Sequence, residues 1–93
     1  MLEMNDVLEL DKDIILRSVN DKFWALNTSN GNQYHINRVT YDILSAINSN
    51  SSIKDIISDV SKGYDVSIER LSADTLQLLS SSIEKGIVHL QGR

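Results

Sequence analysis

The order of its secondary-structure signals constrains the fold of this chain more than any other feature. A β-hairpin, Phe23–Asn37, folds around a turn at Ser29-Asn30-Gly31, and three short amphipathic helical segments follow it directly. This order predicts an α+β fold in which a three-stranded antiparallel sheet is followed by three helices, a winged-helix-like arrangement. A sheet with one free edge beside a helix is a geometry that can hold an extended peptide.

Composition narrows the class of protein. Ninety-three residues are enough for one domain with one core. The chain has no cysteine, and its first residues lack the basic segment of a secretory signal, which together fit a cytoplasmic protein. The net charge of −4 disfavours nucleic acid or an anionic membrane as the main partner. No apolar run approaches the roughly 20 residues of a membrane span.

The first strand signal appears only after a weakly patterned N-terminal segment. Residues 1–13 fit either a leading strand or a loosely held arm, and the domain proper is expected to span residues 14–90. Ile14–Val19 is rich in β-branched residues and is typical of a strand, with Asn20-Asp21-Lys22 as the turn after it.

Two registers are possible for the hairpin. A two-residue Asn30-Gly31 turn pairs Leu26 with His35. A three-residue Ser29-Asn30-Gly31 loop, with the glycine in the left-handed region, pairs Leu26 with Tyr34 instead. We favour the second register because it gathers four apolar side chains on one face, and register follows the buried face. The predicted buried face consists of Trp24, Leu26, Tyr34 and Ile36.

Capping signals place the first two helices. Asn37 can cap a helix from Arg38 to about Asn48, which a polar break at residues 48–51 ends. Ser52 and Asp55 resemble a capping box that opens the second helix, which Gly63 closes. The expected inward residues are Val39, Ile43, Ala46 and Ile47 in the first helix and Ile53, Ile56, Ile57 and Val60 in the second.

The third helix is the longest, Ile68–Lys85, between a Ser67 cap and Gly86, and the apolar tail Ile87–Leu90 is expected to pack back on the core. One stripe of this helix is predicted to be core: Ile68, Ser72, Thr75, Leu79 and Ile83. A neighbouring, mixed stripe consists of Leu71, Asp74, Leu78, Ser82 and Lys85. Either Leu71 and Leu78 merely widen the core contact, or this stripe forms one wall of a groove beside an unpaired strand edge.

No residue pattern predicts catalysis, a metal or a cofactor. His35 and His89 lack a carboxylate or second histidine at the spacing of a metal site. The serines lack a Gly-x-Ser-x-Gly context, and the four glycines fall at a turn, two helix ends and the C-terminus. Acid pairs such as Glu69 and Asp74 are spaced for a solvated helix face. We therefore expect a protein that is not an enzyme and holds no cofactor.

A small winged-helix DNA-binding regulator is the main rival from another class, and a structural subunit of a larger enzyme is a third possibility. A recognition helix needs several basic and amide side chains on one face. The third helix offers Arg70, Gln77 and Lys85 against three acidic residues, and the wing candidate Thr28–Gln33 has no basic residue. This electrostatic footprint is poor, so we expect no nucleic-acid partner.

Four segments resemble the PqqD-like family, the recognition elements that bind precursor peptides in the biosynthesis of ribosomally made peptide natural products. They are LNTSNGNQYHIN, TYDILSAI, SIKDIISDVSKGYDV and ADTLQLLSSSIEKGIV, and the resemblance runs from about residue 14 to residue 90. Its specificity lies in the order and spacing of the segments. NGNQYHIN is slightly more similar to the discrete recognition proteins of lasso-peptide systems, although His35 and Ile36 depart from the aromatic and leucine of their pattern.

The resemblance implies that the leader of a precursor peptide adds as a strand along Gln33–Asn37, against the third helix. The implied peptide-binding residues are Gln33, Tyr34, His35, Ile36 and Asn37 on the strand and Leu71, Asp74, Leu78, Ser82 and Lys85 on the helix. The implied partner is a processing enzyme, such as the leader peptidase or cyclase of lasso-peptide biosynthesis. A PQQ-type peptide chaperone for a radical SAM enzyme is the alternative.

Overall fold

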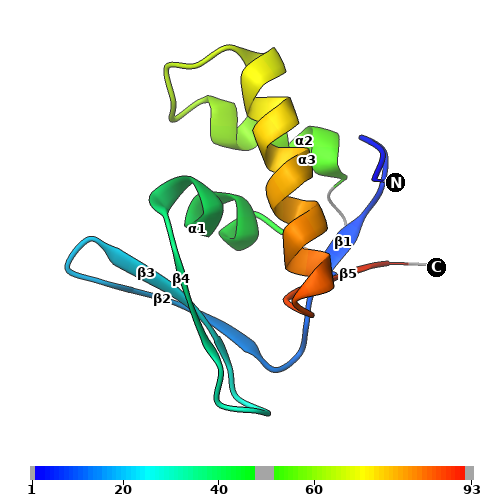
Figure 1. The fold of residues 1–93 in the computed structure, drawn as a ribbon. Coiled ribbons are helices and arrows are strands. Elements are labelled where there is room, and N and C mark those ends of the chain that lie inside the picture. The colour runs from blue at the N-terminus through cyan, green and yellow to red at the C-terminus, as the bar shows by residue number, and fades with distance from the viewer. Residues whose placement is uncertain (1, 48–51, 92–93) are drawn as a thin grey trace.

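The structure is a computed structural model that describes residues 2–47 and 52–91 of the chain (Figure 1). Within these ranges the strands are β1 Leu8–Leu10, β2 Ile14–Val19, β3 Lys22–Asn27, β4 Gln33–Ile36 and β5 Val88–Leu90. The helices are α1 Arg38–Ser45, α2 Ile53–Ser61 and α3 Ile68–Glu84. The fold is α+β, with a three-stranded antiparallel sheet and three helices in the predicted order. In this part of the chain, no helix has the length and apolar character needed to cross a membrane.

The larger sheet has the strand order β2-β3-β4. The β2–β3 connection contains only Asn20 and Asp21, whose φ angles of 50° and 63° are those of a type I′ turn. Lys22, which we expected in this turn, is instead the first residue of β3 and pairs with Val19. Two residues in the left-handed region reverse the chain tightly enough to make a third turn residue unnecessary.

The β3–β4 register differs from both expected registers. Ala25 pairs with Tyr34, so the connecting loop is one residue longer than the favoured register requires. Asn27 holds this loop: its carbonyl accepts from the Gly31 amide at 2.9 Å, and its side-chain oxygen accepts from the Ser29 amide at 2.9 Å. Such side-chain hydrogen bonds to nearby backbone are why asparagine favours turns.

The register decides which side chains face the helices. Since side chains alternate along a strand, Ala25, Tyr34 and Ile36 share the inner face, and Trp24 and Leu26 lie on the outer face. The predicted buried face of Trp24, Leu26, Tyr34 and Ile36 is therefore wrong, because a slip of one residue moves a strand's side chains to the opposite face. Ala25 is fully buried beneath the helices. On the outer face the Trp24 ring lies 5.7 Å from the His35 ring.

The ends of the described chain come together in a second, two-stranded sheet. β1 pairs antiparallel with β5, Leu8 opposite Leu90, and both Leu8 and Val88 are fully buried. The apolar tail therefore packs on the core, as expected. The N-terminal segment also fixes the start of α2, because the Ile53 amide donates to the Asp6 carbonyl at 2.9 Å.

The first two helices begin where the sequence predicts. The Asn37 side chain accepts from the Thr40 amide at 2.8 Å, and Ser52 and Asp55 form a complete capping box. α1 ends at Ser45; its expected end near Asn48 and the polar break at 48–51 lie outside the described residues. The predicted inward stripe of α2 is confirmed: Ile53, Ile56, Ile57 and Val60 are all buried.

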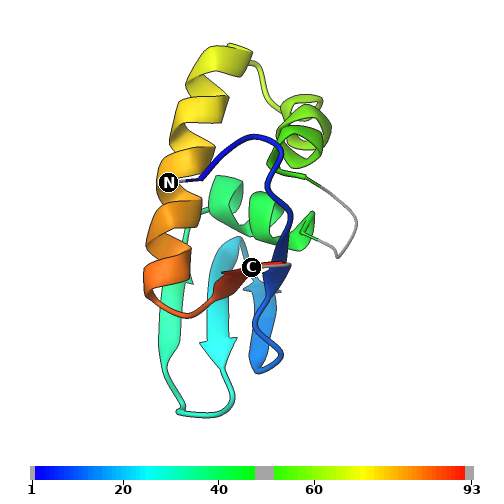
Figure 2. The same cartoon turned by 90° about the vertical axis from the view of Figure 1, so that its right-hand side faces the viewer.

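α3 lies across α1 and α2 (Figure 2), and its buried stripe matches the predicted one only in part: Thr75 and Leu79 are buried as expected. Its buried residues are Leu71, Thr75, Leu79 and Ser82, whereas Ile68 is 51% exposed. The buried stripe extends to Leu71 and Ser82, and α3 packs on α1, α2 and β5. For Leu71, the interpretation that it widens the core contact is correct.

Candidate functional site

One edge of the three-stranded sheet is unpaired among the described residues: β4 has β3 as its only neighbour. The Asn27 amide donates to the Asn32 carbonyl at 2.9 Å, which makes this a hydrogen-bonded pair. Such pairs alternate along an antiparallel ladder, so Tyr34 and Ile36 also direct their backbone groups to β3. The N–H and C=O groups of Gln33 and His35 then point away from β3, toward the free edge.

This edge borders a groove of about 410 Å³ between β4, α1 and the C-terminal half of α3. Figure 2 shows β4 running beside that half of α3. The lining residues are Gln33, Tyr34, His35, Ile36, Asn37, Thr40, Leu44, Leu78, Ser81, Ser82, Lys85 and Ile87. Apolar side chains from β4, α1 and α3 thus lie next to hydroxyl and amide groups and to unpaired main-chain groups. These are the elements of β-augmentation: a main-chain ladder and pockets for alternate side chains.

Two residues at the Gln33 end of the groove contact each other across it. The Lys85 ammonium lies 5.7 Å from the centre of the Tyr34 ring, within the range of a cation–π contact. Lys85 is the C-cap of α3 and Tyr34 lies on the inner face of β4, so this contact links the two walls.

The groove continues past Asn37 into a hollow of about 420 Å³ between α1 and α3. This hollow is lined by Asn37, Val39, Thr40, Asp74, Gln77, Leu78 and Ser81. The Asp74 carboxylate is 3.9 Å from the Arg70 side chain in an exposed ion pair. Because Leu78 and Ser81 line both cavities, the groove and the hollow adjoin along α3.

The structure brings most of the predicted site residues together. In the groove lie Gln33, Tyr34, His35, Ile36, Asn37, Leu78, Ser82 and Lys85, and Asp74 lines the adjoining hollow. Leu71 does not join them, because it is only 4% exposed and belongs to the core. Ser82 is largely buried, and its hydroxyl donates to the Leu78 carbonyl at 2.8 Å.

Sequence reasoning missed two residues that line both cavities, Thr40 and Ser81. Thr40 follows the Asn37 cap by three residues, so a helix starting at Arg38 turns it toward β4. Ser81 lies three residues after Leu78, which places it on the same helix face. Both positions follow from the predicted helix bounds once the face that borders the groove is known.

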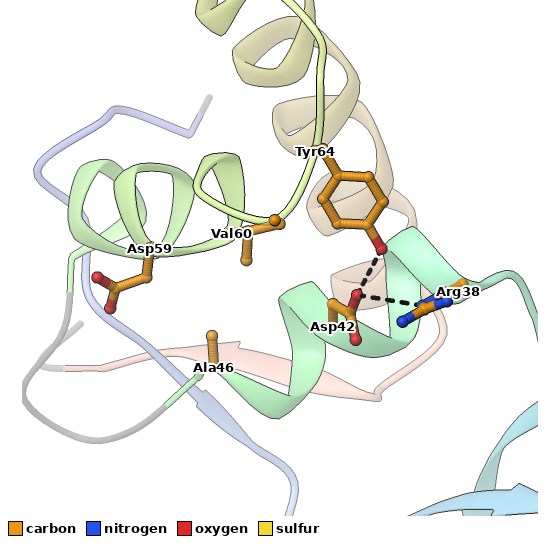
Figure 3. Close-up of a pocket in the computed structure, with 7 residues that line it drawn as sticks. Arg38, Asp42, Ala46, Asp59, Val60 and Tyr64 are labelled. Atoms are coloured by element: carbon orange, nitrogen blue, oxygen red, sulfur yellow. Dashed lines mark hydrogen bonds and ion pairs between the residues drawn. The ribbon is translucent and has the colours of Figure 1, made fainter.

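A separate hollow of about 440 Å³ lies between α1 and the end of α2, lined by Arg38, Asp42, Ala46, Asp59, Val60, Gly63 and Tyr64 (Figure 3). The Tyr64 hydroxyl donates to the Asp42 carboxylate, which also lies 4.0 Å from Arg38. Burial, and then this hydrogen bond, raise the pKa of Tyr64. The polar groups of Tyr64, Asp42 and Arg38 thus satisfy one another, and the cluster ties α1 to the α2–α3 connection.

No metal centre emerges from residues 2–47 and 52–91, which contain no group of three or more potential metal-ligating side chains. His89 makes a hydrogen bond of 2.6 Å to the Asp11 carboxylate, between β5 and the β1–β2 connection. His35 lies on the outer face of the sheet beside Trp24. Each histidine is thus accounted for by a contact within the fold.

The fold and this site define a small, winged-helix-like α+β domain with an unpaired strand facing a helix across a groove. Residues 22–88 match the family model described as Coenzyme PQQ synthesis protein D (PqqD). Because this match covers most of the 93 residues, the chain belongs to the PqqD family.

Two solved structures share the fold at low sequence identity. One, of TbiB1 in complex with the TbiA(beta) leader peptide, has 16% identity and a TM-score of 0.74, and the match covers 91% of this chain and 96% of that chain. The other, of lasso peptide synthetase B1 complexed with the leader peptide, has 18% identity and a TM-score of 0.74, covering 88% and 96%. A comparison with curated protein sequences gave no match.

Proposed function

We propose that this domain binds the leader region of a ribosomally made precursor peptide by strand addition along β4. It would then present the peptide to a processing enzyme of lasso-peptide biosynthesis, such as a leader peptidase or cyclase. The domain itself would be non-catalytic and would act in the cytoplasm. The observation that carries this proposal is the unpaired edge of β4 facing α3 across the groove.

The site residues of this proposal are those that line the groove and its extension. The outward main-chain groups of Gln33 and His35 would form the ladder with the peptide, and Asn37 would continue it. Tyr34 and Ile36 on β4, and Leu78, Ser82 and Lys85 on α3, would contact peptide side chains. The two similar structures support this proposal because both were solved with leader peptides bound.

The contacts that the groove offers set the scale of the expected peptide affinity. Four main-chain hydrogen bonds at about 1 kcal/mol each and two buried apolar side chains at about 2 kcal/mol each total roughly 8 kcal/mol before ordering costs. A micromolar dissociation constant corresponds to about −8 kcal/mol. A preformed strand edge reduces the ordering cost on the protein side, but ordering the peptide still subtracts from this total, so these contacts alone support binding no tighter than micromolar.

The test is a fluorescence-polarisation titration with a labelled leader peptide encoded by a short reading frame beside the gene. His35→Pro removes the outward N–H at the centre of the edge and should weaken binding by at least about tenfold, since proline is tolerated at an edge but donates no ladder bond. His35→Ala is the matched control, because it removes the imidazole but keeps the donor. Unchanged affinity in His35→Pro would contradict strand addition at β4.

The second candidate function is a PQQ-type peptide chaperone for a radical SAM enzyme. The family model, which is described by coenzyme PQQ synthesis, favours it. Both functions would use the same groove and would differ in the precursor and in the enzyme that receives it. Titrating the domain with the leaders of both precursor classes separates them, because the cognate leader should bind at least about tenfold more tightly.

A further inference from the structure

Lys85 differs from the other described residues that line the groove because it is the only lysine, arginine, aspartate or glutamate among them. It makes no ion pair with a described residue: the ion pairs of the described lysines, arginines and histidines involve Arg38, Lys62, Arg70 and His89. Its neighbour Glu84 does not line the groove. In a chain with a net charge of −4, this groove therefore presents a single cation and no anion.

The position of this cation is defined by Tyr34, whose ring lies 5.7 Å below the ammonium. Tyr34 sits between Gln33 and His35, the residues whose backbone groups point to the free edge. In a strand added to that edge, the residue opposite Tyr34 directs its side chain to the inner face, as Tyr34 does. That side chain would therefore approach Lys85, and the one two residues along, opposite Ile36, would approach the apolar part of the lining that includes Leu78.

We propose that Lys85 selects peptides with an aspartate or glutamate opposite Tyr34. This inference rests on the proposed function and adds a specificity rule to it. An acidic side chain there gains a charge-assisted hydrogen bond from an ammonium that has no other anionic partner. A basic side chain brings two like charges together beside an aromatic ring that already contacts one of them. A peptide with a neutral side chain at this position should bind with an affinity between those of the acidic and the basic peptides.

The rule can be tested without knowing the natural ligand. A display library of peptides with about ten randomised positions, enough for one strand and its flanks, is selected against the whole protein. The same selection is run on Lys85→Glu and on the control Lys62→Glu, whose lysine pairs with Asp59 outside the groove. Circular dichroism confirms that each variant is folded.

The wild type and Lys62→Glu should select an acidic residue two positions from an apolar one, and Lys85→Glu should select a basic residue in its place. The order of the two positions reports the strand direction: apolar first means antiparallel to β4, since β4 runs from Tyr34 to Ile36. In titrations of one selected peptide, changing its acidic residue to lysine should weaken binding by about tenfold at low salt and less at high salt.

Two outcomes would contradict different parts of the account. Groove-binding peptides with no acidic preference, or a preference that Lys85→Glu does not invert, would overturn the role of Lys85 but leave strand addition intact. Failure to select any peptide whose binding His35→Pro weakens would instead contradict the proposed function.

Discussion

His35 contributes its backbone and its side chain to different surfaces. The backbone groups point to the free edge of β4, whereas the imidazole lies on the outer face, 5.7 Å from the Trp24 ring. Tyr34 is its opposite, because its backbone pairs with Ala25 and its side chain faces the groove. Alternation along a single strand therefore assigns neighbouring residues to the two roles that strand addition requires.

The family resemblance implies a peptide-binding role for both Leu71 and Leu78, and the structure separates the two residues. Leu71 is only 4% exposed in the core, whereas Leu78 is partly buried and lines the groove. We expect Leu71→Glu to lower the free energy of unfolding by more than about 3 kcal/mol, because it buries a charge without a partner. We expect Leu78→Glu to stay folded and lose peptide binding. Urea unfolding and a binding titration on both variants measure this difference.

The matched variant Leu78→Met controls for packing, because it keeps an apolar side chain of similar volume and should retain both stability and binding. A folded Leu71→Glu variant with full stability would show that the core is placed incorrectly. Unchanged peptide affinity in Leu78→Glu would show that the groove is placed incorrectly.

Thr75 is a polar residue in the core whose hydroxyl has no hydrogen-bond partner among the described residues. It is fully buried on α3. An unsatisfied buried hydroxyl costs about 1–3 kcal/mol, so the isosteric change Thr75→Val should raise the free energy of unfolding by about 1 kcal/mol. Thr75→Ser, which keeps the hydroxyl and removes the methyl group, should lower it by about 1 kcal/mol. Chemical denaturation of the two variants tests both signs, and a destabilised Thr75→Val would reveal a partner for the hydroxyl.

At the scale of elements, the features that local sequence signals set could be predicted, whereas the features that non-local contacts set could not. The Ser52–Asp55 capping box and the Ser67 cap lie within four residues of the helices they start, so the sequence shows them directly. The β3–β4 register depends on how Asn27 closes its loop, and a different closure reverses both faces of the strand. The buried stripe of α3 depends on where α2 and β5 pack, which the sequence pattern of α3 alone does not contain.

The hydrogen bond between Asp11, after β1, and His89 on β5 predicts a pH dependence of stability. The Asp11 carboxylate accepts a hydrogen bond from His89 at 2.6 Å, which is the largest cause lowering its pKa from the usual 3.8, followed by the hydrogen bond from the Asp13 amide. A carboxyl whose pKa is lower in the folded state stabilises the fold above its unfolded pKa. That stabilisation is lost as the pH falls below about 4 and through the folded pKa.

Asp11→Asn removes this titration. The difference in free energy of unfolding between the wild type and Asp11→Asn should shrink as the pH falls from about 4 toward 2. Urea denaturation across this range measures the difference. A difference that grew with acidity would show that Asp11 is not stabilised in its charged form.

At the scale of the whole molecule, the elements that hold the helices in place differ from those that form the proposed binding edge. The β1–β5 sheet, α2 and the Tyr64–Asp42 hydrogen bond hold the helices in place, away from the free edge of β4. The groove itself is built from β4, α1 and the C-terminal half of α3. The correctly predicted groove residues lie on or next to two continuous elements, β4 and α3, which local sequence signals define. The prediction for Leu71 was wrong because the core packing decides which face of α3 is buried.

The central claim is that a peptide adds as a strand to the free edge of β4, and amide hydrogen exchange measured by NMR tests it most directly. In the free domain the Tyr34 and Ile36 amides should already be protected, because they pair with β3, whereas the Gln33 and His35 amides should exchange freely. Adding a leader or display-selected peptide should protect Gln33 and His35 specifically. Binding that left these two amides unprotected, while protecting the outer edge of β2, would contradict the account.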